Sequence, residues 1–337
     1  MKRTTTHPSF NCLRLSATVA ICVLGLSVWP ALAETEENLD KTFTASPGGQ
    51  LVVEVEFGAI EVTSNAGDQV SIQVMRRVTR ASKEDEQSFL EERPVTIAQE
   101  GATITVRSKG PSLRSSSKGK QRTEARYTIS VPGQFNARLK TAGGAIAVSD
   151  LKGECDAQTS GGPLKFARLR GPLDGQTAGG AIHVNDCEGT LKIKTSGGGI
   201  EVSGGGGALD GRTAGGTVKV ESFKGPVRVE TTGGGIHLND VAGKVEGSTS
   251  GGSISASFSS LSDSVKLETS GGSVTLHAPS DAAFDLDAST SGGSASSELP
   301  VTITGKKSRD HLRGPVNGGG KTVVLRSSGG GVQVKKL

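Results

Sequence analysis

The sequence predicts an all-β fold, a parallel β-solenoid (β-helix) in which a single chain winds in rungs of about 18 residues. Two observations predict it. The phrase Thr-(Ala/Ser/Thr)-Gly-Gly recurs at a fixed interval, and the residues between its copies alternate between apolar and polar in short runs. A fixed period of this length is typical of stacked-repeat proteins, whose units bury their apolar surface only against their neighbours.

The repeated phrase occurs nine times, with six intervals of 18 residues followed by intervals of 20 and 21. Its copies begin at Thr141, Thr159, Thr177, Thr195, Thr213, Thr231, Thr249, Thr269 and Thr290. Apolar residues favour the positions five, seven, ten and fourteen after each Thr, and in the 18-residue units a glycine always stands twelve after it. A spacing of two that is broken between pieces predicts two or three short strands per unit, separated by turns.

The glycines and threonines of the unit have structural roles in this prediction. Turns that need positive φ or close backbone packing favour glycine, so the glycine columns mark the corners of each rung. The Thr column shares the parity of inward positions, so we expect a stacked Thr ladder whose hydroxyls bond to the backbone at a corner. Units stacked in register pair as a parallel ladder at about 4.8 Å per rung, and we expect right-handed winding.

Residues 1–33 have the features of a signal peptide. Three basic residues precede a short apolar run at 15–28, and a small-x-small cleavage motif ends at Ala33. An uncleaved anchor is the alternative, but the run is shorter than the roughly 20 residues of a membrane span. We therefore expect an exported protein of the periplasm, cell surface or extracellular space, with no membrane span in the mature chain. The 38 Lys and Arg include those three, so the remainder nearly balances the 34 Asp and Glu and indicates no nucleic-acid partner.

Residues 34–140 are expected to form an irregular, β-rich N-terminal cap, because the end of a stack exposes strand edges. Gly58-Ala-Ile-Glu-Val62 matches Gly144-Ala-Ile-Ala-Val148 of the first regular repeat and indicates a degenerate first rung. In chain order we expect a polar lead-in at 34–50, a strand at 51–62 continued by Val70, Ile72 and Val74, a short helix at 84–92, a hairpin at 95–106, a mobile loop at 107–125 and a strand at 127–131.

Residues 141–290 contain the regular repeats. Residues 291–337 are expected to form irregular rungs that cap the other end, with Ser328-Gly329-Gly330 as a decayed final repeat. Of the two cysteines beyond the leader, Cys155 and Cys187 lie two rungs apart, roughly 10 Å along the stack. A disulfide needs Cα atoms within about 7 Å, so we expect both to be small core residues with free thiols.

The same pattern resembles a known family. The residues that carry the resemblance are the Gly-x-Ile-x-Val strand at Gly58–Val62, the segment Tyr127-Thr-Ile-Ser-Val-Pro132, and the recurring Thr-x-Gly-Gly-x-Ile-x-Val. Over roughly residues 40–335 the chain resembles the bacterial putative-adhesin domain of unknown function, a family of β-strand-repeat proteins that are exported or belong to the envelope. The resemblance implies this architecture, and it implies no catalytic residue.

A cluster of basic residues is the candidate binding site. Seven basic residues stand against one acid in the predicted loop: Arg107, Lys109, Arg114, Lys118, Lys120, Arg122 and Arg126. Such a cluster can bind anionic glycans, lipid head groups or phosphorylated lipid sugars. The alternative is a solvated, flexible loop, since charge runs of this kind are common.

An outward column six residues after each Thr carries His183, Glu201, Lys219 and His237 on successive rungs. We expect an exposed ladder of charges with neighbours about 5 Å apart. A metal site is the alternative, but the two histidines are about 14 Å apart by this spacing, too far to share one ion. No metal and no cofactor are expected.

An enzyme that acts on polysaccharides is a further possibility, because β-helices include such enzymes. Asp150, Asp186 and Asp240 stand nine after their Thr, where Asp is a normal turn residue rather than half of an acid/base pair. Ser115-Ser-Ser-Lys118 is a lone S-x-x-K motif without the partner motifs of serine acyltransferases. The hypothesis would rest on fold analogy alone.

The sequence therefore predicts a non-enzymatic exported solenoid that presents an extended binding surface, as an adhesin or a cell-envelope interaction protein. Its partner would be an envelope component, an anionic glycan or another copy of the chain. The alternative is a structural rod or filament subunit of the envelope that self-associates through the solenoid ends.

Overall fold

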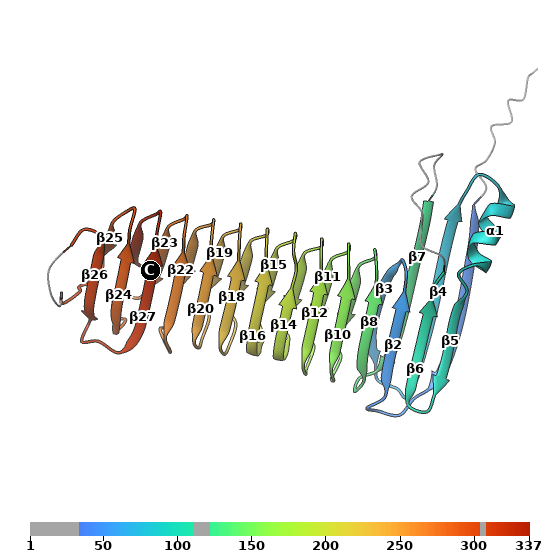
Figure 1. The fold of residues 1–337 in the computed structure, drawn as a ribbon. Helices are drawn as coiled ribbons and strands as arrows, with labels where there is room; N and C mark the ends of the chain where they lie inside the picture. Colours follow the sequence, from blue (N-terminus) through green and yellow to red (C-terminus); the bar gives the residue numbers. More distant parts are fainter. Residues whose placement is uncertain (1–33, 111–121, 304–307) are drawn as a thin grey trace, which may run out of the picture. The chain divides into compact units, whose positions relative to one another are not determined.

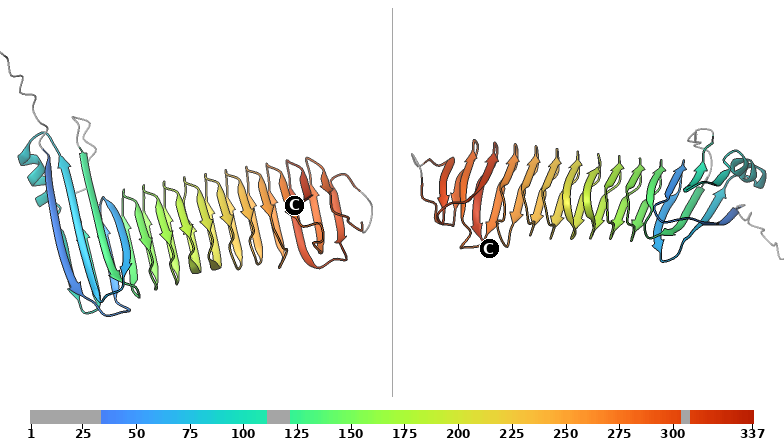
Figure 2. Two further views of the ribbon diagram at one scale, coloured as in Figure 1. Left: turned by 180° about the vertical axis from the view of Figure 1, so that it is seen from behind. Right: turned by 90° about the horizontal axis from the view of Figure 1, so that it is seen from below.

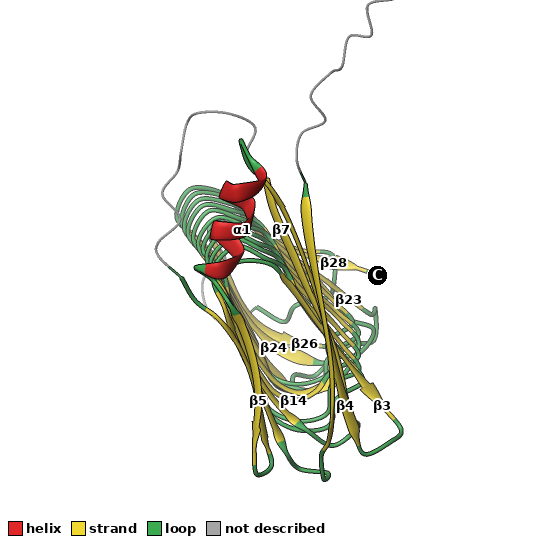
Figure 3. Cartoon of the chain, turned by 90° about the vertical axis from the view of Figure 1, so that its right-hand side faces the viewer, coloured by secondary structure: helices red, strands yellow, loops and turns green. Residues whose placement is uncertain are grey.

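The computed structural model describes residues 34–110, 122–303 and 308–337. The described residues belong to one compact unit made almost entirely of strands (Figure 1). The strands form two 14-stranded sheets, called sheet A and sheet B below. In a view along the stack, the strands of each sheet overlie one another as one of two layers (Figure 3).

The elements fall into three groups along the chain. The N-terminal block contains β1 (Thr35–Thr44), β2 (Gln50–Val55), β3 (Ala59–Asn65), β4 (Gln69–Thr79), α1 (Lys83–Glu91), β5 (Val95–Glu100), β6 (Thr103–Ser108), β7 (Arg122–Pro132) and β8 (Asn136–Thr141). The regular rungs contain β9 (Ile146–Ser149), β10 (Cys155–Thr159), β11 (Leu164–Ala167), β12 (Leu173–Thr177), β13 (Ile182–Asn185), β14 (Glu188–Lys194), β15 (Ile200–Ser203), β16 (Gly206–Thr213), β17 (Val218–Glu221), β18 (Val227–Thr231), β19 (Ile236–Asn239), β20 (Val245–Thr249), β21 (Ile254–Ser257), β22 (Val265–Thr269) and β23 (Val274–Ala278). The C-terminal group contains β24 (Phe284–Thr290), β25 (Ala295–Ser297), β26 (His311–Val316), β27 (Lys321–Ser327) and β28 (Val332–Lys336).

Each regular rung has two strands, one in each sheet. A sheet B strand ends at the repeated Thr, the Gly-Gly corner follows, and a sheet A strand begins five residues after the Thr. Neighbouring rungs pair in parallel and in register, so that Leu164 lies beside Ile182 and Thr159 beside Thr177. The predicted all-β parallel solenoid is confirmed, with two strands per rung; the handedness of its winding stays a prediction.

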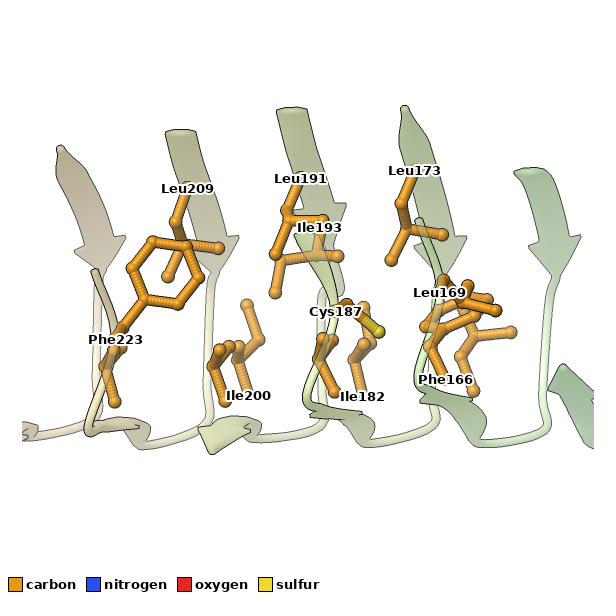
Figure 4. Close-up of a cluster of buried hydrophobic side chains, with 14 of the residues drawn as sticks. Phe166, Leu169, Leu173, Ile182, Cys187, Leu191, Ile193, Ile200, Leu209 and Phe223 are labelled. Carbon is orange, nitrogen blue, oxygen red and sulfur yellow. The ribbon is translucent and has the colours of Figure 1, made fainter. Parts of the chain in front are cut away.

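The core is one continuous cluster of apolar side chains between the two sheets. The residues five and seven after each Thr point inward from sheet A, and Leu173, Leu191 and Leu209 face them from sheet B (Figure 4). Phe166 and Phe223 are at most 1% exposed, and the ring of Phe166 occupies the space that a side chain at Gly175 would need. Every regular rung adds a similar layer of apolar contacts, so the period of the repeat in the sequence is also the period of the core.

The Thr column forms the predicted ladder. The Thr177 hydroxyl donates to the carbonyl oxygen of Gly162 in the preceding rung at 2.9 Å, and it accepts from the Gly180 N–H of its own rung at 3.2 Å. The same pair of bonds recurs at each repeated Thr from Thr159 to Thr290, and the nine Thr side chains are buried. Each hydroxyl therefore joins two rungs at the corner.

Two glycine columns meet different requirements. At Gly180, in the corner, a Cβ atom would stand 2.0 Å from the carbonyl oxygen of Gly162, although its φ is not in the left-handed region. Gly171, twelve after its Thr, has a φ of 137° and its Cβ would stand 2.4 Å from the carbonyl oxygen of Gly153. Close stacking of backbone on backbone thus excludes side chains from both columns.

The N-terminal block extends both sheets beyond the first regular rung. β2 and β3 pair in parallel with β8 and β9, which is the predicted degenerate first rung, turning at Gly58. The segment 34–50, expected as a polar lead-in, contains β1, an edge strand antiparallel to β4. Val70, Ile72 and Val74 lie on β4, which runs antiparallel to β7 instead of continuing the rung. The predicted hairpin is confirmed as β5 and β6.

The predicted short helix is also confirmed, as α1. Its N-cap is Ser82, whose side chain accepts from the Asp85 N–H. Buried charges tie this region to the sheets: Arg76 is 0% exposed, forms an ion pair with Glu37 and donates to the carbonyl oxygen of Arg93. A buried arginine with these partners leaves little freedom in how the block closes over the end of sheet A.

The C-terminal group departs from the expected order. In sheet B, β27 lies between β22 and β24, and in sheet A, β28 lies between β23 and β25. The last rung of the chain is therefore inserted inside the stack, and the C-terminus lies inboard of β24 and β26 (Figures 1 and 2). Ser327 takes the place of the repeated Thr, with its hydroxyl 2.7 Å from the carbonyl oxygen of Gly272.

Both cysteines of the described residues lie in the core, whereas the predicted signal peptide, residues 1–33, lies outside those residues. Cys155 is 1% exposed and Cys187 is 0% exposed, and both thiols are free, as predicted. Burial raises the pKa of the Cys155 thiol to about 12 and raises that of Cys187 in the same direction.

Candidate binding surface

A row of outward-facing side chains crosses seven neighbouring strands of sheet B. The residue before each repeated Thr points outward, because the Thr itself points inward. In-register pairing places Glu54 of β2 between Arg107 of β6 and Lys140 of β8, and the same register continues through the next four strands. In spatial order the row is Arg107, Glu54, Lys140, Gln158, Gln176, Lys194 and Arg212, which we call the basic row.

Two adjoining hollows follow the basic row on the side of the Thr-x-Gly-Gly corners. One, of about 280 Å³, extends from Lys140 to Lys194 and is lined between them by Gln158 and Gln176. The other, of about 360 Å³, lies beside Glu54 and Lys109. Both are lined by Lys140, Thr141 and Ser160, so they adjoin there, and we call the two hollows together the corner groove.

The second residue of each repeated phrase keeps the corner groove open. Ser160, Ala178 and Ser196 occupy this position beside the groove, and all three are exposed. Their small side chains leave room above the corner, while the Ser hydroxyls offer both a donor and an acceptor. The groove therefore has a polar lining, with Lys140 and Lys194 in one hollow and Lys109 beside the acids Glu54 and Glu56 in the other.

The electrostatics of the basic row favour a negative ligand. Glu54 is paired with Lys109 at 3.1 Å and with Arg107 at 3.5 Å. The hydrogen bond from Lys109, together with the charges of Lys109, Arg107 and Lys140, holds the pKa of the Glu54 carboxyl below its usual value. Within the described part of the chain, Lys140 and Lys194 have no ion-pair partner, so their charges remain available at the surface.

The predicted basic cluster is only partly brought together. Arg107 and Lys109 meet at Glu54, beside the corner groove. Arg122 and Arg126 are exposed on β7, in the other sheet, so they do not share that site. Arg114, Lys118 and Lys120 lie outside the described residues. The predicted loop at 107–125 is wrong at its ends, because 107–108 belong to β6 and 122–125 to β7, where long antiparallel pairing overrides the Ser-, Lys- and Arg-rich composition.

The predicted charge ladder is present on the outer face of sheet A. His183 Nδ1 lies 3.2 Å from Glu201 Oε2, and Lys219 Nζ lies 3.6 Å from Glu201 Oε1. The first two border a shallow hollow of about 410 Å³ that also includes Lys165. Here Lys219 is paired with both Glu201 and Glu221, and the described residues include no group of three metal-ligating side chains.

The three aspartates considered for acid/base chemistry occupy a turn. Asp150, Asp186 and Asp240 all have φ between 49° and 62°, the left-handed region in which Asp is tolerated. Asp150 accepts two hydrogen bonds from the guanidinium of Arg168, at 2.5 Å and 2.7 Å, which lower the pKa of its carboxyl. A carboxylate held ionised by an arginine is a turn-edge ion pair, not a general acid.

Sequence reasoning missed Lys140, Lys194, Gln158 and Gln176. The signal was available in part, because all four stand immediately before a repeated Thr and so share one outward column. The alignment of this column with Arg107 and Glu54 depends on long-range strand pairing, which the repeat does not specify.

Within the described ranges, no helix has the length and the apolar character of a membrane span. A search of the curated proteins finds no match. The family model for Toastrack DUF4097 matches residues 49–335.

Several solved structures are similar to this chain. One is a putative adhesin from Parabacteroides distasonis ATCC 8503, with 11% identity and a TM-score of 0.39 over 89% of this chain and 97% of that one. Another is a putative adhesin from Bacteroides fragilis NCTC 9343, with 10% identity and a TM-score of 0.32 over 89% and 97%. A third is a putative lipid binding protein from Parabacteroides distasonis ATCC 8503, with 12% identity and a TM-score of 0.31 over 89% and 96%.

Proposed function

This chain belongs to the Toastrack family, DUF4097, and we propose that it is a non-enzymatic, exported binding protein that holds an extended anionic glycan in the corner groove. The observation that carries the proposal is the in-register row from Arg107 to Arg212, in which Lys140 and Lys194 have no ion-pair partner among the described residues. The two arginines at its ends are paired, Arg107 with Glu54 and Arg212 with Asp210 and Glu230. Since strands repeat at about 4.8 Å, the two unpaired lysines stand about 14 Å apart along the row, which suits a polymer that carries more than one acidic group.

The neutral members of the basic row complete the match to a sugar chain. Lys140 and Lys194 are about 14 Å apart by strand spacing, and Gln158 and Gln176 lie between them. The amides of the two glutamines can bond to hydroxyl groups. The Nε2 groups of the two glutamines already donate to Asp156 and Asp174, which fixes their direction. Lys and Arg then supply attraction to acids, and the amides and Ser hydroxyls supply contacts to sugar hydroxyls.

Charge, not ring stacking, has to provide the affinity. Among the described residues, every aromatic side chain is buried or half-buried, so none offers a platform for a sugar ring. Binding through exposed cations is weakened by salt, because the Debye length falls to about 8 Å at physiological ionic strength. We therefore expect binding that is strong only when several sites on the polymer act together.

The test uses polygalacturonate, an acidic glycan, and dextran as its neutral counterpart. The variant Lys140→Gln/Lys194→Gln is compared with Lys165→Gln/Lys224→Gln, which removes the same charge from exposed sites outside the groove. We expect the first variant to bind polygalacturonate about tenfold more weakly, at about 0.7 kcal/mol per contact, and the second to bind like the unchanged chain. Equal loss in both variants, or binding to dextran of equal strength, contradicts the proposal.

The strand edges do not favour the alternative of a rod that grows end to end. At one end of the stack, β25 has three residues and β26 contains Pro315, while at the other end β1 carries Glu37, Asp40 and Lys41. Short, charged and proline-containing edges oppose the addition of further strands. The enzyme alternative has no support from the aspartate turns described above.

A further inference from the structure

The last rung of the chain is not the last rung of the stack. We call residues 321–336, which form β27 and β28, the C-terminal rung. It lies between the rung of Thr269 and the rung of Thr290, although it follows both in sequence (Figure 2). The chain passes over one rung position, builds the next one, and then returns to fill the position that it left.

The C-terminal rung makes the same contacts on both sides as an internal rung. In sheet B, Val323 pairs in parallel with Val265 on one side and with Leu286 on the other. In sheet A, Val332 pairs with Val274 and with Ala295. Val323, Leu325, Val332 and Val334 are at most 1% exposed, so the rung contributes a full layer of the core.

The hydroxyl ladder also passes through this rung. Ser327 donates to the carbonyl oxygen of Gly272 at 2.7 Å and accepts from the Gly330 N–H at 2.9 Å. Thr290 then donates to the carbonyl oxygen of Gly330 at 2.5 Å. The rung of Thr290 thus contacts Gly330 by the same bond that Ser327 makes to Gly272, so neighbouring positions in the stack are chemically equivalent.

A four-residue connection, 317–320, joins β26 to the C-terminal rung across the end of β24. Val316 and Lys321 pair with opposite sides of Phe284, so they are about two strand spacings apart, roughly 9.6 Å. Asn317, Gly318 and Gly319 all have positive φ, and the Asn317 side chain donates to two carbonyl oxygens of the 280–282 turn. The connection is a short, sharply bent strap.

We propose that the C-terminal rung is exchanged between two copies of this chain, each rung filling the vacant position in the other copy. This goes beyond the proposed glycan binding. All paired groups and buried side chains of the rung meet the same partners whichever copy supplies it, so only the 317–320 connection differs between the closed and exchanged forms.

The first test shortens the connection. With Gly318, Gly319 and Gly320 deleted, Val316 and Lys321 are separated by one residue and can be at most about 7.2 Å apart, less than the span across β24. A rung that cannot reach its own position can bury its apolar side chains only in a second copy, and short connections under strain favour such exchange. We expect the shortened chain to be a dimer by size-exclusion chromatography with light scattering, while the unchanged chain at low concentration is a monomer.

A disulfide reports which copy supplies the rung. Asp287 and Val324 are direct partners on neighbouring strands, so Asp287→Cys/Val324→Cys places two thiols within bonding range. In the shortened chain we expect a covalent dimer on a non-reducing gel. In the chain with its natural connection we expect a disulfide within one chain. Single substitutions at either position serve as controls for nonspecific bonds. A folded, monomeric shortened chain, with or without the internal disulfide, overturns the proposal.

A second test does not depend on the folding of the shortened chain. The Asp287→Cys/Val324→Cys chain with its natural connection is unfolded under reducing conditions, refolded at a series of protein concentrations and then oxidised. Exchange predicts that the fraction of covalent dimer rises with protein concentration. Chains that remain monomeric carry the disulfide within one chain. An internal bond alone at every concentration rejects exchange.

Discussion

The hydroxyl of Thr213 donates to the carbonyl oxygen of Gly198 in the preceding rung, 2.7 Å away. The hydroxyl oxygen of Thr213 also accepts from the Gly216 N–H at 3.2 Å, so one buried side chain satisfies polar groups of two rungs. Each regular rung repeats this arrangement, which makes the Thr column a specific polar link in a core that is otherwise apolar.

Replacing Thr213 by Val tests this link, because the side chain keeps its shape and loses its hydroxyl. Thr213→Val leaves the carbonyl of Gly198 and the N–H of Gly216 without this partner at a buried corner, and we expect a loss of about 1–3 kcal/mol in the free energy of unfolding. Urea denaturation followed by circular dichroism measures it. Thr213→Ser is the control and should lose less than Thr213→Val; the reverse order would contradict the assigned role of the hydroxyl.

The two glycines of one corner give a matched pair of substitutions. A Cβ at Gly180 would stand 2.0 Å from the carbonyl oxygen of Gly162, whereas the nearest atom to a Cβ at Gly179 is 3.6 Å away. We expect Gly180→Ala to cost more than about 3 kcal/mol, since the opposing backbone has to move. Gly179→Ala should change the stability by less than about 1 kcal/mol. Denaturant midpoints measure the loss of stability in the two variants. Similar midpoints would show that the corner accommodates a Cβ at Gly180 and contradict the close backbone contact.

The neighbouring arginines Arg76 and Arg77 differ in burial, so their replacement should have different effects on stability. Arg76 is 0% exposed and bonded to Glu37 and to the Arg93 carbonyl, whereas Arg77 pairs at the surface with Glu34 and Glu36. Arg76→Met removes the cation paired with Glu37 and one of the donors to the Arg93 carbonyl, and should destabilise the N-terminal block by about 1.5–3 kcal/mol. Arg77→Met should cost less than about 1 kcal/mol.

Hydrogen exchange locates the effect of Arg76→Met. Because each rung contacts mainly its neighbours, we expect faster exchange in residues 34–110 and little change in the rungs beyond Thr195. A uniform rise in exchange along the whole chain would instead indicate that the block and the repeats unfold as one unit.

The regular part of the fold could be predicted because its information is local and repeated. The Thr column, the glycine columns and the left-handed turn at Asp150 each follow from the position of a residue within an 18-residue unit. Register then follows as well, since stacking like on like buries every apolar column at once.

The rest of the fold and the candidate site depend on pairing between strands that are distant in the sequence. β1 is an edge strand with one partner, so only Leu39 and Phe43 are apolar in its ten residues and the segment reads as polar. The basic row needs β6, β2 and β8 to be neighbours, an order that no local pattern encodes. The place of the C-terminal rung was equally hidden, because the rung of Thr269 presents the same groups to either following rung.

The last prediction concerns Cys155, whose thiol pKa burial raises from an ordinary value of 9.0 to about 12. The folded chain holds this proton more tightly than the unfolded chain, so its contribution to stability is complete below pH 9 and is lost as the pH rises towards 12. Between these values, the stability of the unchanged chain should fall more steeply with pH than that of Cys155→Ala, by up to about 1.4 kcal/mol per pH unit. Urea denaturation at pH 8.5, 9.5 and 10.5 measures the difference between the two slopes, which cancels the titration of other groups. Parallel slopes would mean that the thiol is not held neutral in the folded chain, and rapid reaction of the folded chain with iodoacetamide at pH 8 would lead to the same conclusion independently.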